Sequence, residues 1–254
     1  MIVEAAAIFT PISMFLGGLT YASCAPACNF WGKVVSHGPA GARRVAITFD
    51  DGPTPGSTER ILDVLRDAGV VASFFVIGAN VRRHTQLLRR MHEEGHLIAN
   101  HSQNHSHYGI CRVTSYWLRE IVETDRAIEE TIGVRPAMYR PPCGMKTWHT
   151  FDAMRTSGHT LVNWSRRAID GLPTTTQRIM QRFEKISGGE ILLLHDGVEP
   201  NTSYAERSAT IAVVPMLLEK LRRENLTPVR LDELLGLPAY QSAGVAGELV
   251  GAAR

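Results

Sequence analysis

Apolar and polar residues follow one another in two patterns from Arg44 onward. Short apolar runs rich in β-branched residues, such as Val45–Phe49, are typical of buried strands, and longer stretches with apolar residues every three or four positions are typical of helices. Glycine follows several of these longer stretches, as Gly69 follows Ser57–Ala68, at the position where a helix ordinarily ends. Strands that alternate with helices over short connections predict a parallel sheet covered by helices.

About seven strand–helix units follow one another, close to the eight of a closed α/β barrel. The predicted strands are Val45–Phe49, Val70–Ile77, Leu97–Asn100, Ala137–Tyr139, Thr160–Trp164, Glu190–Leu194 and Pro228–Leu231. The predicted helices are Ser57–Ala68, Val81–Glu94, Thr114–Ile132, Thr147–Thr156, Thr175–Ile186 and Ala209–Glu224, with a helical turn at Asp232–Leu235.

Composition agrees with a single large domain and argues against two classes of protein. The chain has 254 residues, 44% of them hydrophobic, which is enough for one substantial core. Residues 41–237 are interpreted as this domain, and the small, polar stretch 238–254 as a flexible tail. A net charge of +2 without a long run of like charges gives no sign of nucleic-acid binding. Four cysteines without a Cys-x-x-Cys pair are too few for a disulfide scaffold.

The first 40 residues form an apolar N-terminal segment. No charged residue occurs between Ala5 and Gly32, which favours a signal sequence or a membrane anchor. The protein is therefore expected to be secreted, periplasmic or membrane-anchored, with membrane association through this segment. Pro11 and the Gly17-Gly18 pair weaken a long spanning helix, so a segment that packs on the domain stays an alternative.

Polar residues that are suited to chemistry lie at or just after the ends of the predicted strands. In a parallel α/β barrel, the carboxyl ends of the strands converge on one mouth, where such folds place their active sites. We therefore expect these side chains to meet. In chain order they are Asp50 and Asp51, His101 and His105, Arg140, Asp170, and His195 with Asp196.

These residue types indicate a metal-dependent hydrolase. His101 and His105 can present two imidazoles to one ion if the turn between them is helical, and a carboxylate from Asp50 or Asp51 would complete the ligand set. Such a set leaves positions open for water and substrate, and a divalent ion lowers the pKa of its water and polarises a carbonyl. Zinc is the default, and cobalt, nickel or iron fit the same ligands.

The remaining polar residues suggest acid–base roles. Asp50 and Asp51 are neighbours on an extended segment, so their side chains point apart, and one can bind the metal while the other accepts a proton. His195 can protonate a leaving amine or alkoxide, and a nearby Asp170 would keep it protonated. Arg140 can pair with the base and fix its orientation.

Four motifs resemble those of the polysaccharide deacetylases, the family 4 carbohydrate esterases related to nodulation-type chitooligosaccharide deacetylases. Thr48–Pro53 resembles the first motif of this family, His101–His105 the second, Arg140–Gly144 the third and Leu192–Asp196 the fifth. The resemblance spans roughly Val45 to Leu235, and four motifs in the same order are far more specific than any one alone.

The resemblance implies a distorted seven-stranded α/β barrel and a role for each matched residue. Asp50 would be the general base and His195 the general acid, with Arg140 orienting the first and Asp170 tuning the second. Leu193 would line the pocket for the acetyl methyl group. The remaining implied roles are the metal ligands Asp51, His101 and His105, and an oxyanion donor, the backbone N–H of Cys143.

Two positions depart from the family pattern. Cys143 stands where an aromatic residue is usual, and Gly171 follows Asp170 where tryptophan is usual. Both changes remove a bulky wall of the substrate groove and leave the proposed chemistry intact. Cys143 is interpreted as a passive residue, with an oxidisable thiol or an extra metal ligand as alternatives. His107 is expected to support a ligand or face solvent, and Asp196 to support the site or cap the next element.

The predicted function is removal of an N-acetyl group from an amino sugar of chitin, peptidoglycan or a related glycan. Ester hydrolysis on acetylated xylan is an alternative, since the same acid serves both leaving groups. Deacylation of a lipid-linked sugar is a third, if the N-terminal segment anchors the protein. A catalytically inactive glycan-binding module is the alternative of another class, although it would not require the base, the ligands and the acid together.

Overall fold

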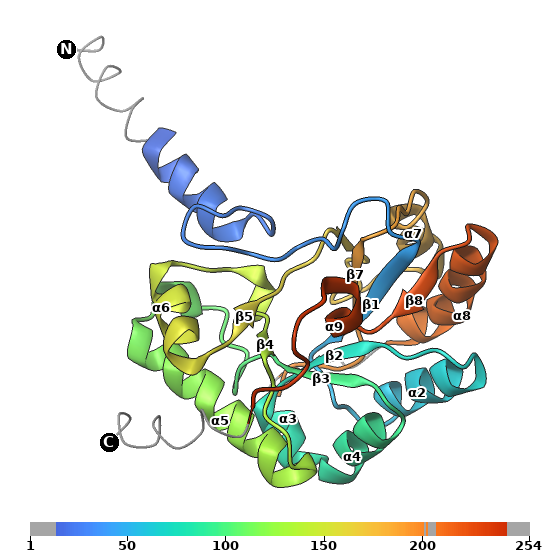
Figure 1. Cartoon of the computed structure of the whole chain (residues 1–254), viewed down its shortest axis with the longest axis horizontal. Helices are drawn as coiled ribbons and strands as arrows, with labels where there is room; N and C mark the ends of the chain where they lie inside the picture. The colour runs from blue at the N-terminus through green and yellow to red at the C-terminus, as the bar shows by residue number, and fades with distance from the viewer. Residues whose placement is uncertain (1–13, 201, 203–206, 243–254) are drawn as a thin grey trace.

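The computed structural model describes residues 14–200, 202 and 207–242 (Figure 1). The strands are β1 (Arg44–Asp50), β2 (Ser73–Val76), β3 (Leu97–Asn100), β4 (Met138–Tyr139), β5 (Thr160–Leu161), β6 (Arg166–Arg167), β7 (Ile191–His195) and β8 (Thr227–Val229). The α-helices are α2 (Ser57–Asp67), α3 (Gly78–Arg83), α4 (Thr85–Glu93), α5 (Thr114–Ile132), α6 (Trp148–Ser157), α7 (Thr176–Arg182), α8 (Ser208–Arg223) and α9 (Leu231–Leu235). Short 3-10 turns are η1 (Gly109–Cys111) and η2 (Pro142–Gly144).

The strands form one sheet in the order β5-β4-β3-β2-β1-β7-β6, with β8 added beside the start of β1. All of these strand pairs are parallel. β5 pairs with β4 and β6 pairs with β7, so the single stretch of chain from β5 to β6 links the two edges of the sheet. Counted as one strand, that stretch makes seven and closes a distorted (β/α) barrel, which confirms the predicted fold.

Alternation along β1 separates the two faces of the sheet. Val45, Ile47 and Phe49 belong to the large core cluster between the sheet and the outer helices, among them α2, α4 and α8. Ala46 belongs instead to the cluster inside the barrel, which Leu231 and Leu234 of α9 complete. Because side chains on a strand alternate between faces, Asp50 at the end of β1 shares the interior face with Ala46.

Helix boundaries agree with the sequence pattern except in two regions. The predicted helix Thr175–Ile186 ends early, because α7 stops at Arg182. The predicted helix Val81–Glu94 is wrong as a single element, because His84 has φ −132° and ψ 48° and separates α3 from α4. The predicted strand Thr160–Trp164 is longer than the observed one, because β5 ends at Leu161 and β6 begins only at Arg166, beyond the predicted range. Between the two strands, the backbone N–H of Ser165 donates to the carbonyl oxygen of Ile191 at 3.1 Å.

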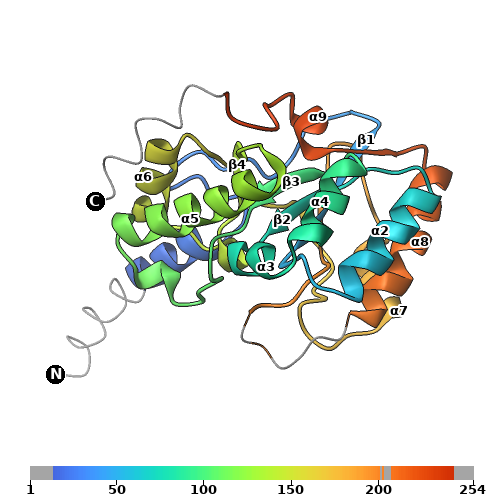
Figure 2. The same cartoon turned by 90° about the horizontal axis from the view of Figure 1, so that it is seen from below.

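The N-terminal segment contacts the domain. Residues 14–24 are helical and continue into a stretch that lies along β5 and α6 (Figures 1 and 2). Ala22 and Ser23 are buried, whereas Met14, Phe15 and Leu16 are exposed. Among residues 14–200, 202 and 207–242, no helix is both long and apolar enough to cross a membrane. Residues 1–13, the start of the segment predicted as a signal or anchor, lie outside the described residues.

The end of the described chain also packs on the domain. The backbone N–H of Ala137 donates to Ala239 at 3.2 Å, and that of Gln241 donates to Arg135 at 2.9 Å. The first residues of the predicted tail therefore bond to the chain that enters β4, while residues 243–254 lie outside the described part.

Candidate active site

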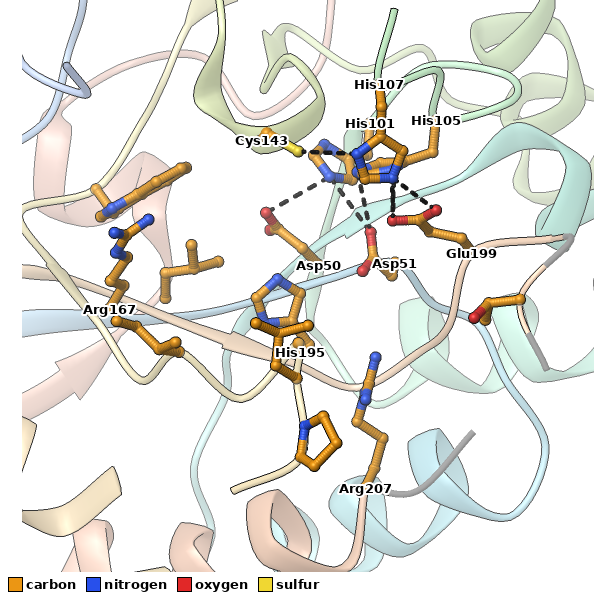
Figure 3. A pocket seen from close by; sticks show the side chains of 17 residues that line it. Asp50, Asp51, His101, His105, His107, Cys143, Arg167, His195, Glu199 and Arg207 are labelled. Carbon is orange, nitrogen blue, oxygen red and sulfur yellow. Dashed lines mark hydrogen bonds and ion pairs between the residues drawn. The ribbon is translucent and has the colours of Figure 1, made fainter. Parts of the chain in front are cut away.

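One cavity of about 650 Å³ opens at the carboxyl ends of the strands (Figure 3). The predicted site residues that line it come from β1, from β7 and from the turns after β3 and β4. The structure thus brings together residues that are up to 145 positions apart, since Asp50 pairs with His195 across the β1–β7 ladder. The residues that line the cavity include Asp50, Asp51, His101, His105, Cys143, Leu193, His195 and Glu199.

A buried group of three side chains fits a divalent cation. Asp51, His101 and His105 each offer one atom, and these atoms lie within 4.8 Å of one another. The Asp51 Oδ1 atom is 3.5 Å from His101 Nε2 and 3.4 Å from His105 Nε2. Burial would raise the pKa of the Asp51 carboxyl, but the imidazoles of His105 and His101 hold it well below its usual range. The carboxyl group is therefore ionised and able to bind a cation.

Hydrogen bonds within the site support this interpretation. Asp51 Oδ1 is buried and accepts no hydrogen bond from the part of the chain that the structure describes, a costly state for a carboxylate oxygen unless something else binds it. The Nδ1 atom of His101 donates to the carbonyl oxygen of Arg140 at 2.7 Å. A carbonyl can only accept, so the hydrogen lies on Nδ1 and the Nε2 lone pair is free to bind a metal. An oxygen–imidazole set of this kind suits zinc and similar ions.

Positive backbone φ angles mark three of the predicted site residues. Asp51 has φ 74°, His105 has φ 52° and Cys143 has φ 55°. Residues other than glycine rarely adopt this left-handed region, and the strain persists only where the surrounding structure imposes it. At Asp51 the reversal of the chain directly after β1 turns the carboxylate toward the two histidines while Asp50 keeps the orientation of the strand.

Asp50 lies beside the candidate metal site and is held by Arg140. The Nη1 atom of Arg140 donates to Asp50 Oδ1 at 2.6 Å and to Thr48 Oγ1 at 3.0 Å. The guanidinium is fully buried, and its other nitrogens donate to the carbonyl oxygens of Val162 and Asn163 where β5 and β6 part. Arg140 therefore serves both the carboxylate and the interrupted strand.

His195 and Asp170 form a second pair next to Asp50, since His195 is the partner of Asp50 on the neighbouring strand β7. Asp170 Oδ1 is 2.7 Å from His195 Nδ1, and its Oδ2 accepts from the backbone N–H of His195 and from Thr210 Oγ1. Burial would lower the pKa of His195, but the Asp170 carboxylate overcomes it and raises this pKa to about 9. The imidazole is thus protonated at neutral pH, as a proton donor requires.

Comparison with known proteins identifies the family. A polysaccharide deacetylase family model matches residues 37–162. A peptidoglycan-N-acetylglucosamine deacetylase of Bacillus cereus is 31% identical over 210 residues, which cover 80% of this chain and 93% of that protein. A chitooligosaccharide deacetylase of a Bradyrhizobium species is 35% identical over 202 residues, 77% of this chain and 92% of the relative. The chain belongs to the polysaccharide deacetylase family.

A solved structure agrees with this assignment. A family 4 carbohydrate esterase from Streptomyces lividans, in complex with acetate, superposes with a TM-score of 0.66 at 28% identity. The match covers 75% of this chain and 93% of that one. The resemblance first seen in four short motifs therefore extends over most of the domain.

The departures from the pattern of the polysaccharide deacetylases leave the cavity open beside His195. A Cβ atom added at Gly171 would lie 3.6 Å from the His195 ring, in ordinary contact, so the backbone there faces the imidazole directly. Leu193 is nearly buried inside the barrel and lines the cavity. Cys143 is exposed as a residue, yet desolvation of its thiol raises its pKa to about 11, which keeps the thiol protonated at neutral pH.

Asp196 directly follows β7 and is bonded to residues at the start of α2. It is fully buried, its Oδ2 accepts from Thr58 Oγ1 at 2.5 Å, and its carbonyl oxygen accepts from Ser57 Oγ at 2.5 Å. It thereby ties the start of α2 to the end of β7. A side chain at Gly52 would collide with this carboxylate, because an added Cβ would meet Asp196 Oδ2 at 2.1 Å.

Glu199 had no clear signal in the sequence, whereas His107 was expected to support a ligand or face solvent. Glu199 lies against His105 and His107, and nothing marks it except its position four residues after His195. His107 is half-exposed and pairs with Glu199, and its Nδ1 lies 3.6 Å from the Cys143 sulfur. It is outside the Asp51–His101–His105 group.

The N-terminal segment supports the turn that carries Cys143. The backbone N–H of Lys146 donates to Ser23, and its Nζ donates to the Ala25 carbonyl at 2.6 Å. Asn163 Nδ2 donates to the Pro26 carbonyl at 2.9 Å. Lys146 directly follows this turn and is fully buried.

Deleting residues 1–26 is expected to lower the free energy of unfolding by about 2–6 kcal/mol, because the two buried donors of Lys146 would lose partners worth about 1–3 kcal/mol each, whereas Asn163 Nδ2 keeps its bond to the Gly144 carbonyl. Deleting only residues 1–20 retains all three bonds and is the matched control. Urea unfolding of the two purified proteins measures the difference. Equal stability of both truncations would show that these bonds contribute nothing measurable.

Proposed function

We propose that this polysaccharide deacetylase removes the N-acetyl group from an amino sugar of a glycan such as chitin or peptidoglycan, and that zinc is its metal. The observation that carries the proposal is the convergence on one cavity of the Asp51–His101–His105 group, the Asp50–Arg140 pair and the His195–Asp170 pair. A glycan-binding module would need neither the buried carboxylate Asp50 nor the protonated imidazole His195 beside a metal site. The relatives named above act on substrates of this class.

In the proposed reaction, the metal site and Asp50 activate water, and His195 with Asp170 protonates the leaving group. When bound, a divalent ion supplies Lewis acidity that polarises the acyl carbonyl and acidifies water. Asp50 accepts the proton of the attacking water, and Arg140 fixes the orientation of this carboxylate. The backbone N–H of Cys143 donates to the oxygen that becomes negative as the carbonyl carbon turns tetrahedral.

The leaving amine departs toward His195. The protonated His195 donates its Nε2 proton to the amine as the carbon–nitrogen bond breaks, while Asp170 holds Nδ1. Leu193 faces the interior of the barrel and lines the end of the cavity that receives the acetyl methyl group. The products are a free amine on the sugar and acetate.

Acetate release from a panel of glycans tests this proposal. We expect the chelated protein to be inactive, and addition of zinc to restore acetate release from acetylated chitooligosaccharides or peptidoglycan. Because ester and amide substrates share the same acid, acetylated xylan is included, and release from xylan alone would identify an esterase. No metal-dependent release from any substrate would contradict the proposal and favour a binding module.

A further inference from the structure

Glu199 lies against the metal-site histidine His105 from across the cavity. It follows β7, whereas His105 follows β3, and the two side chains meet at the rim (Figure 3). Glu199 Oε1 is 3.2 Å from His105 Nδ1. Both carboxylate oxygens also contact His107 Nε2, at 2.7 and 2.8 Å. The carboxylate is therefore held from one side by His107 and faces a candidate metal ligand on the other.

The two nitrogens of His105 face different partners. Nε2 faces Asp51 at 3.4 Å, inside the candidate metal group, and Nδ1 faces Glu199. Nδ1 is buried and, among the described residues, has no partner besides this ion-pair contact. An ionised carboxylate can only accept, so it favours the tautomer with hydrogen on Nδ1 and leaves the Nε2 lone pair for a metal.

His101 has the same arrangement with a different partner. Its Nδ1 donates to the backbone carbonyl of Arg140, and its Nε2 faces Asp51. Both imidazoles thus point Nε2 at the same position and turn Nδ1 toward an oxygen atom. For His101 that oxygen belongs to the backbone, whereas for His105 it belongs to a side chain that can be replaced.

We propose that Glu199 is a positioning residue that orients His105 for metal binding, and that His107 holds the Glu199 carboxylate in place. The inference rests on the metal site of the proposed function and adds a residue that acts through His105. The loop that follows the acid His195 thereby contributes to metal affinity at the opposite side of the cavity.

Zinc affinity, measured by competition with a chromogenic chelator, tests this role without reference to turnover. We expect Glu199→Ala to weaken zinc binding by about 10- to 100-fold, the usual effect of losing a carboxylate behind a ligand histidine. Glu199→Gln keeps an oxygen acceptor without the charge, so a smaller loss is expected. The melting temperature of the metal-free protein should be unchanged, since Glu199 is about one-third exposed, its side chain having 32% of its surface accessible.

Two control variants separate the possible failures. Glu123→Ala removes an exposed carboxylate on α5 and should leave zinc affinity unchanged. His105→Ala should abolish tight zinc binding. If it does, and Glu199→Ala binds zinc like the wild type, the positioning role of Glu199 is wrong and the metal site is correct. If His105→Ala also binds normally, the metal site itself is wrong.

Zinc stoichiometry distinguishes positioning from direct binding. His105, His107 and Glu199 also lie close enough to one another to hold an ion. We expect one zinc per chain in the wild type and in Glu199→Gln. Two zinc ions in the wild type and one in Glu199→Gln would make Glu199 a ligand of a second ion and overturn the proposal.

Discussion

Asp50→Asn is expected to lower kcat by about 10²- to 10⁴-fold, the usual contribution of a general base, while zinc affinity changes little. The amide cannot accept the proton of the attacking water at neutral pH. Asp50 is outside the Asp51–His101–His105 group, so the metal ligands remain. Acetate release and chelator competition on the same preparation measure the two quantities separately.

Asparagine is the informative substitution because it preserves the packing around Arg140. Its carbonyl oxygen can still accept from the buried guanidinium, whereas alanine would leave that charge unpaired at a cost of about 3–5 kcal/mol. Asp67→Asn, at the exposed end of α2, is the matched control for loss of one carboxylate. Wild-type kcat in a zinc-loaded Asp50→Asn protein would assign the base to another group.

The sequence predicted the site well where strand geometry decides it. Parallel strands end at one mouth, so polar residues after β1, β3, β4 and β7 had to meet, and they do. Side chains along β1 alternate between the two faces of the sheet. This alternation places Asp50 on the interior face with Ala46 and its neighbour Phe49 on the outer face. These inferences needed no knowledge of loop conformation.

Contacts made by loops and by broken elements were not predictable in this way. Glu199 meets His105 only because two distant loops converge, and no local pattern records such a contact. The fifth predicted strand ends early, at Leu161, and the carbonyl oxygens of Val162 and Asn163 beyond it accept from the Arg140 guanidinium, which no local pattern records. The left-handed backbone at Cys143 is similarly imposed by tertiary structure, since cysteine has no preference for it.

His195→Gln is expected to lower kcat by about 10²- to 10⁴-fold, because glutamine cannot donate the proton that the leaving amine receives from the protonated imidazole. The wild-type pH profile gives an independent test of the same role. The acid must be protonated to act, and Asp170 raises the pKa of His195 to about 9. The alkaline limb of kcat/KM should therefore fall as the pH rises through 9 and be absent well below it.

Asp170→Asn is expected to move this alkaline limb to lower pH, because the carboxylate is what raises the pKa of His195. Without that charge, burial lowers the pKa of His195 and only the weaker effects of Asp51 and Asp50 oppose it, so activity should decline at a lower pH than in the wild type. Thr210→Val removes only one hydrogen bond to Asp170 and should shift the limb less. Profiles of kcat/KM against pH for the three proteins make the comparison. An alkaline limb that stays in place in Asp170→Asn would mean that another group sets it, and the assignment of His195 as the acid would fail.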